Sequence, residues 1–108
     1  MEDFLYLSQL PPFHEDEAQK NKLLDEAIFY FQKAREVDPE IKEVYGLLGT
    51  LLLQREQYEE AKIVLEKGVE LFPDSPTIWQ NLSFMYAKMG EKEKAEEAYE
   101  KSKQLQEE

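Results

Sequence analysis

Apolar residues recur at intervals of three and four along most of the chain, as they do on one face of an α-helix. Proline interrupts this pattern at Asp38-Pro39 and at Phe72-Pro73, because proline lacks a backbone donor and restricts the residue before it. Met89-Gly90-Glu91 supplies a further tight turn. The pattern predicts helices near residues 41–54, 58–71, 75–88 and 92–106.

The pattern repeats every 34 residues, a spacing kept by Ala27, Ala61 and Ala95. Further sets with the same offset are Phe31, Leu65 and Tyr99; Ala34, Gly68 and Ser102; Tyr45 and Trp79; Gly49 and Ser83; and Pro39 and Pro73. Small residues therefore recur where two antiparallel helices must approach closely, which predicts one helix hairpin per period. Glu56 stands where the last period has Gly90, so either Glu56 adopts the strained turn geometry or that turn differs.

These sets resemble the tetratricopeptide repeat, whose pattern is W-x2-L-G-x2-Y, then A-x3-F, then P. The matching residues are Trp79-x2-Leu82-Ser83-x2-Tyr86 with Ala95-x3-Tyr99 in the last repeat, Tyr45-x2-Leu48-Gly49-x2-Leu52 with Ala61-x3-Leu65 and Pro73 in the middle one, and Ala27-x3-Phe31 with Pro39 in the first. The resemblance implies an all-α fold, an α-α superhelix of antiparallel helix hairpins (a TPR-like solenoid). It also implies a binding module whose concave surface is lined by the first helix of each repeat.

The resemblance divides the chain into a tetratricopeptide domain at residues 15–108 and an N-terminal apolar segment, or cap, at residues 1–14. The repeats are expected at about residues 8–41, 42–75 and 76–108, and the first of them is degenerate.

The first repeat departs from the pattern because Pro11 and Pro12 stand in its opening helix. Two conformations stay open for this region. It forms either one long helix over residues 15–37, or a short helix from Pro12 that is broken near Asn21 and Lys22.

The charge balance narrows the classes of partner. The 108-residue chain has 24 acidic and 13 basic residues, and its net charge of −11 repels phosphate backbones and anionic lipid heads. We therefore expect a protein or peptide partner, and neither nucleic acid nor a membrane. The N-terminal sequence MEDFLYLSQLPPFHEDE has acid where a signal peptide needs base, so we expect a cytoplasmic adaptor or scaffold.

The sequence offers few residues for chemistry. It has no Cys, no phosphate-binding glycine loop and no calcium-loop pattern, so we expect neither a cofactor nor a metal. An enzymatic alternative would depend on His14, the sole histidine, together with nearby acids. His14 stands in a short polar stretch without a serine elbow, and a solvated surface histidine is the simpler interpretation.

The groove-facing positions of the second and third repeats define the candidate binding site. They are Leu47, Thr50, Leu53 and Gln54 from the middle repeat and Gln80, Asn81, Phe84 and Lys88 from the last. Related modules that clamp acidic C-terminal peptides of chaperones carry several Lys, Arg and Asn residues here, whereas in this chain only Asn81 and Lys88 suit a carboxylate. The comparison favours an apolar ligand over an acidic tail.

Residues 44–53 are apolar on nearly all sides, whereas a helix with one face in water should show a polar stripe. A second surface is therefore expected to cover this helix. One candidate is the N-terminal segment, through Phe4, Leu5, Leu7, Leu10 and Phe13. The other is an amphipathic helix or an apolar peptide of a partner.

A second apolar pair, Phe29 and Ile63, occupies equivalent positions on the opposite helices, where the last repeat has Glu97. Two interpretations stay open. The pair is either a patch for the N-terminal segment or for a second copy of the chain in a homodimer, or two isolated exposed hydrophobes. The polar outer face of helix 92–106 predicts that this helix closes the stack at its C-terminal end.

The leading functional hypothesis is a non-catalytic protein–protein interaction module, or scaffold, that binds a partner peptide or helix in an apolar concave groove. The alternative is a small chaperone for a secretion or assembly subunit, because small chaperones of bacterial secretion systems share this fold. An enzyme that uses His14 is the third hypothesis.

Overall fold

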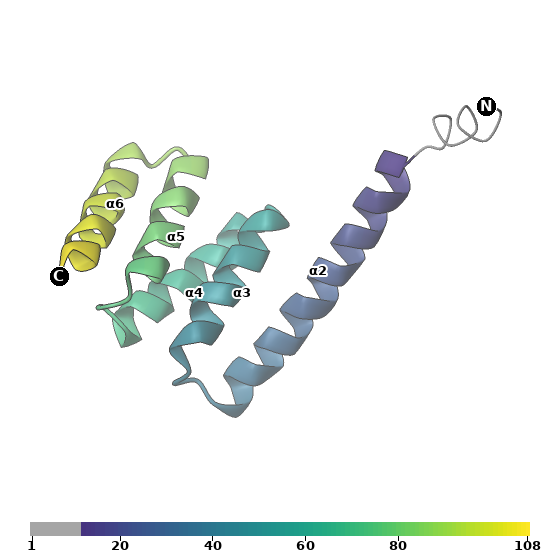
Figure 1. Ribbon diagram of the computed structural model, residues 1–108, viewed down its shortest axis with the longest axis horizontal. Coiled ribbons are helices and arrows are strands. Elements are labelled where there is room, and N and C mark those ends of the chain that lie inside the picture. Colours follow the sequence, from purple (N-terminus) through teal and green to yellow (C-terminus); the bar gives the residue numbers. More distant parts are fainter. Residues whose placement is uncertain (1–11) are drawn as a thin grey trace.

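The computed structural model describes the backbone of residues 12–108 and the side chains from residue 16 onward. This part consists of five helices, which are α2 (Pro12–Val37), α3 (Lys42–Gln54), α4 (Tyr58–Leu71), α5 (Pro76–Lys88) and α6 (Lys92–Glu107). Figure 1 shows them as successive antiparallel helices, with α2 at one end of the stack and α6 at the other. The expected all-α superhelix of helix hairpins is therefore confirmed.

The four helices predicted from the apolar pattern agree with α3 to α6 within one residue at each end. Residues 12–37 form one continuous helix, so the break considered near Asn21 and Lys22 is wrong. No proline or glycine follows Pro12 within this helix to interrupt it, and Leu24 and Ile28 are buried where α2 packs against α3.

α2 extends well beyond its neighbour. It contains 26 residues against 13 in α3, which correspond to about 39 Å and about 20 Å. The Arg55 Nε atom, just after α3, lies 2.8 Å from the Asp25 carboxylate, so the end of α3 lies level with the middle of α2. Residues 16–20 are all exposed, and Figure 1 shows this half of α2 projecting from the stack.

α3 and α5, which we call the inner helices, approach their neighbours closely at two repeated positions that glycine occupies. A Cβ atom at Gly68 would lie 3.1 Å from Tyr45 Cβ and 3.2 Å from Ile78 Cγ2, which is tighter than ordinary packing. The place of a Cβ atom at Gly49 is already filled by the side chain of Leu65, which is fully buried.

One period later, serine occupies the same two positions and bonds to the neighbouring backbone. Ser83 Oγ donates to the carbonyl of Ala95 at 2.8 Å, and Ser102 Oγ donates to the carbonyl of Pro76 at 3.0 Å. The small-residue positions inferred from the sequence are therefore helix contacts in both repeats.

Repeated hydrogen bonds also fix the junctions between hairpins. Tyr45 Oη donates to the carbonyl of Pro39 at 2.6 Å, and Trp79 Nε1 donates to the carbonyl of Pro73 at 2.8 Å. The two donors, Tyr45 and Trp79, are one period apart in the sequence, and so are the two acceptors, Pro39 and Pro73. The bond ties the first turn of α3 and of α5 to the proline that ends the preceding hairpin.

The turns inside the two hairpins provide a matched stability test. Glu56 has φ 59° and Gly90 has φ 80°, so both adopt the left-handed region that costs a side-chain-bearing residue about 1 to 2 kcal/mol. We expect Glu56→Gly to raise the free energy of unfolding by about 1 kcal/mol and Gly90→Ala to lower it by a similar amount, measured by urea denaturation. Changes of the same sign in both variants would contradict this account.

Candidate functional site

Six of the eight predicted groove residues line one cavity of about 300 Å³ between α3 and α5. Phe84 is 51% exposed and Leu53 is 8% exposed, so the cavity joins a buried leucine to a half-exposed aromatic ring. We call it the Phe84 cavity. Its lining residues are Thr50, Leu53, Gln54, Gln80, Asn81 and Phe84.

A second cavity of about 280 Å³ continues along the same two helices. We call it the Leu47 cavity, after the predicted residue in its lining, which is 50% exposed. Thr50 belongs to both cavities, which makes them neighbouring parts of one groove. The other lining residues are Lys42, Glu43, Gly46, Ser75, Thr77 and Ile78.

The groove residues predicted from the sequence include Leu47 and Thr50 of the Leu47 cavity, but neither Lys42 and Glu43 on α3 nor the residues on the α5 side. Thr77 lines it at the position one period after Glu43, which also lines it. The 34-residue offset was therefore the signal that could have found Thr77, once Glu43 had been placed beside the groove.

A hydrogen-bond network crosses the groove where the two cavities meet. Asn81 Nδ2 donates to the carbonyl of Gly46 at 3.1 Å and to Thr50 Oγ1 at 3.0 Å, and Thr50 Oγ1 donates to the same carbonyl at 2.9 Å. Both hydrogens of the Asn81 amide are thus used within the protein. Asn81 ties α5 to α3, and its Nδ2 is committed to that contact.

Lys88, the remaining predicted groove residue, lines neither cavity, but its Nζ lies 5.3 Å from the centroid of the Phe84 ring. The other charged residues of α3 and α5 are Lys42 and Glu43, which have opposite signs. α6 alone contains five acidic residues. The groove is therefore nearly neutral and apolar on a strongly acidic protein.

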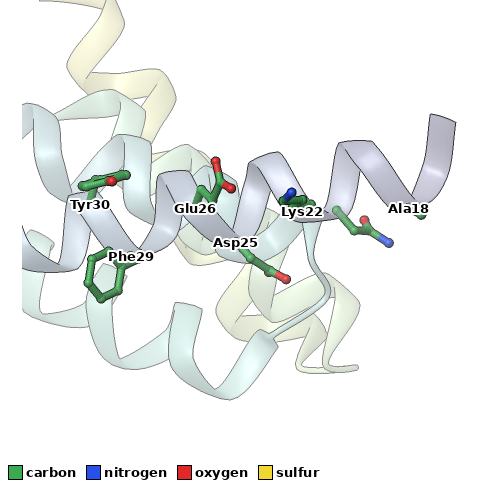
Figure 2. A pocket seen from close by; sticks show the side chains of 7 residues that line it. Ala18, Lys22, Asp25, Glu26, Phe29 and Tyr30 are labelled. Atoms are coloured by element: carbon green, nitrogen blue, oxygen red, sulfur yellow. The ribbon is translucent and has the colours of Figure 1, made fainter. Parts of the chain in front are cut away.

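A third hollow, of about 600 Å³, lies along α2. Figure 2 shows that the side chains around it belong to a single helix, which makes it an open surface and not an enclosed pocket. Phe29 and Tyr30 contribute perpendicular rings with centroids 5.5 Å apart. The lining residues are Ala18, Asn21, Lys22, Asp25, Glu26, Phe29 and Tyr30.

The structure does not bring the predicted outer pair together through neighbouring helices. Phe29 is 55% exposed on α2 and Ile63 is 66% exposed on α4, and α2 packs against α3 with no close backbone contact to α4. Each side chain is exposed on its own helix.

The pKa of Tyr86 is shifted at a contact between α5 and α4. Burial, together with the hydrogen bond that Tyr86 Oη donates to Glu66 Oε2 at 2.7 Å, raises the pKa of Tyr86 above its ordinary value. Among the side chains from residue 16 onward, no group of three or more acidic or histidine residues could hold a metal ion. The side chains of residues 1–15, which include His14 and all the apolar residues proposed for the N-terminal segment, lie outside the described part.

None of the described helices is both long enough and apolar enough to span a bilayer.

Two family models of the tetratricopeptide repeat match the chain, one over residues 18–82 and the other over residues 76–108. Together these matches extend over all four helices that line or support the groove.

Solved structures of similar fold include those of MamA and PcrH. A structure of MamA (MSR-1 C2) has 26% sequence identity and a TM-score of 0.73, covering 82% of this chain and 51% of MamA. The structure of PcrH in complex with the chaperone binding region of PopD has 21% identity and a TM-score of 0.73, covering 97% of this chain and 77% of PcrH. The chain thus spans about half the length of the MamA chain. No curated protein matches the sequence.

Replacing Asn81 tests the network that joins the two inner helices. A carboxylate in Asn81→Asp has no hydrogen to donate to the Gly46 carbonyl, so we expect a loss of about 1 to 3 kcal/mol at neutral pH. Protonation restores a donor, which raises the pKa of the introduced carboxyl above its unfolded value of about 3.9. The deficit is therefore present above the folded-state pKa and shrinks as the pH falls through it.

The measurement is the urea midpoint of parent and variant at several pH values. Gln80→Glu, which adds the same charge at the exposed neighbouring position, is the control and should change little. Equal deficits in the two variants would show that charge, and not the lost donor, weakens the fold.

Proposed function

Because the chain belongs to the tetratricopeptide repeat family, we propose that it is a non-catalytic interaction module that binds an apolar segment of a partner protein between α3 and α5. The observation that carries this proposal is the pair of adjoining cavities, which together expose Leu47 and Phe84 within one nearly uncharged groove. An apolar partner segment would bury both side chains and remove them from water.

The lining chemistry supports binding over catalysis. The Phe84 cavity presents aliphatic and aromatic side chains, amides and the Thr50 hydroxyl, and this hydroxyl is already bonded to Gly46 and Asn81. Lys88 is the cation nearest the Phe84 ring. These groups can position a peptide by packing and by a few polar contacts.

The solved relatives support a protein partner in general terms. The PcrH structure contains the chaperone binding region of PopD, which shows that PcrH binds a protein partner. At 21% identity the likeness to it shows the fold alone, so the chaperone hypothesis stays a narrower form of our proposal. The enzymatic alternative through His14, a homodimer, a cytoplasmic location and the exclusion of nucleic acid and membranes stay predictions.

The domain organisation is part of the same proposal. Residues 42–75 and 76–108 each contain one of the hairpins α3–α4 and α5–α6, and we assign them as complete repeats. Residues 8–41 are assigned as the degenerate repeat, with α2 as its helical part.

The test compares two aromatic residues in equivalent local settings. Phe84 is paired with Lys88 and lies in the groove, whereas Tyr99 is paired with Lys103 on α6, and both rings are half exposed. Peptides selected from a random displayed library against the parent protein provide the probe. We expect Phe84→Glu to weaken their binding at least about tenfold, because the charge must be desolvated by an apolar ligand.

Tyr99→Glu is the control and should leave the affinity unchanged. Both variants should keep the urea midpoint of the parent, because both side chains are half exposed. Equal affinities for the parent and Phe84→Glu, with every selected peptide, would overturn the groove as the binding site.

A further inference from the structure

We infer that two copies of this chain associate through α2, by packing an exposed apolar stripe of this helix antiparallel against the same stripe of the second copy. We call it the α2 stripe, and its members are Leu23, Ala27, Tyr30, Ala34 and Val37. The α2 stripe is separate from the groove between α3 and α5, so this contact is a second interaction surface beyond the proposed function.

The α2 stripe has the spacing of a coiled-coil seam. Its members are four and three residues apart in alternation, as are the a and d positions of a heptad, so they lie on one side of the helix. With Lys20, which continues the spacing, the stripe is about 26 Å long. Leu23 is 58% exposed, Tyr30 is 68% exposed and Val37 is 86% exposed. Three large apolar side chains therefore share one exposed side of α2.

The same side of the helix is buried in the other two hairpins. Val64 and Ala98, one and two periods after Tyr30, are each 2% exposed, where α4 packs against α3 and α6 packs against α5. Ala27 and Ala34 keep the small residues of the period on α2. α2 lies at one end of the stack in Figure 1, and the described part of the chain has no helix before it. The α2 stripe is thus a helix-packing surface on which no described helix lies.

The charge along this part of α2 permits two copies to meet. Residues 20–37 contain four basic and three acidic residues, whereas the whole chain has a net charge of −11. Two copies of the chain repel each other overall, but this repulsion is absent along the stretch that carries the α2 stripe.

The sizes of the side chains are complementary when two stripes run antiparallel. With the two-fold axis between Ala27 and Tyr30, Tyr30 lies level with Ala27 of the second copy, and Leu23 lies level with Ala34 of the second copy. Large residues then face small ones along the seam, and the symmetry makes each contact twice. A parallel pair would instead set Tyr30 against Tyr30 and alanine against alanine, with uneven packing.

The same arrangement pairs opposite charges. Glu26 and Lys33 each precede an alanine of the α2 stripe, at the g positions of the heptad, and Glu26 lies level with Lys33 of the second copy. Lys33 Nζ lies 3.5 Å from Glu36 in a strongly exposed pair, which is weak enough to be exchanged. Because one chain supplies both halves of the charge pair, a second copy fits the α2 stripe.

Phe29, one of the two residues of the predicted outer pair, lies outside the α2 stripe. Figure 2 shows Tyr30 and Glu26 on one side of α2 and Phe29 and Asp25 on the other. Phe29 is 55% exposed, so it offers a control on the same helix with a similar ring and a similar exposure.

The first test measures mass by sedimentation velocity at concentrations from about 1 to about 100 μM. We expect the mass to rise from the 12.8 kDa of one chain toward twice that value. Tyr30→Ser should raise the dissociation constant of the dimer at least about tenfold, because it removes the largest side chain of the seam. Phe29→Ser should keep the dissociation constant of the parent. Far-UV circular dichroism checks that both variants stay helical.

The second test exchanges the charges beside the seam. Glu26→Lys and Lys33→Glu each place two like-charge contacts in the dimer, so each variant alone should dissociate at least about fivefold more readily than the parent. An equimolar mixture of the two variants restores opposite charges at both contacts and should form a heterodimer with about the affinity of the parent. Glu97→Lys and Lys101→Glu on α6 change the net charge equally and should have no effect.

Three results would overturn the inference. A parent that stays monomeric over the whole range would mean that another segment or a different protein covers the α2 stripe. A dimer that Tyr30→Ser leaves unchanged would place the contact on another surface, and charge variants that mixing fails to rescue would exclude the antiparallel register. None of these measurements involves a peptide ligand, so the proposed function is decided separately by the affinity of Phe84→Glu for the selected peptides.

Discussion

The close approach of neighbouring helices is the constraint on which the rest of the structure depends. A Cβ atom at Gly68 would crowd Tyr45 and Ile78, and Leu65 fills the space that Gly49 leaves. Repetition of these small positions keeps the hairpins in one register, so α3 packs against α5 as well as against its partners in sequence. A larger side chain at such a position would separate two helices and move every residue that they present to the groove.

This packing gives the two sides of the stack different chemistry. The inner helices bury Tyr45, Leu48 and Leu82 among the neighbouring helices, while Leu47 and Phe84 remain half exposed in the groove. Most acidic residues lie on the other helices, where water solvates them. The Phe84 cavity therefore has no carboxylate in its lining, while the acidic residues of the other helices repel anions.

The register of the repeats was sufficient to find most of the groove. Thr50, Leu53, Gln54, Gln80, Asn81 and Phe84 were placed there by counting along the helices, and they line one cavity. Counting could not show that Asn81 donates both its amide hydrogens to α3. That contact requires the carbonyl of Gly46 to lie beside α5, which depends on the distance between two helices that are not neighbours in sequence.

The sequence by itself determined the helices from α3 to α6, their pairing and the small residues between them, because each follows from local periodicity and a fixed offset. The tertiary structure decided that α2 runs unbroken past α3, which was one of the two conformations that the sequence left open. It also decided that Phe29 and Ile63 lie on helices that do not pack together. A repeat offset relates positions by symmetry, whereas contact between them depends on which helices pack side by side in space.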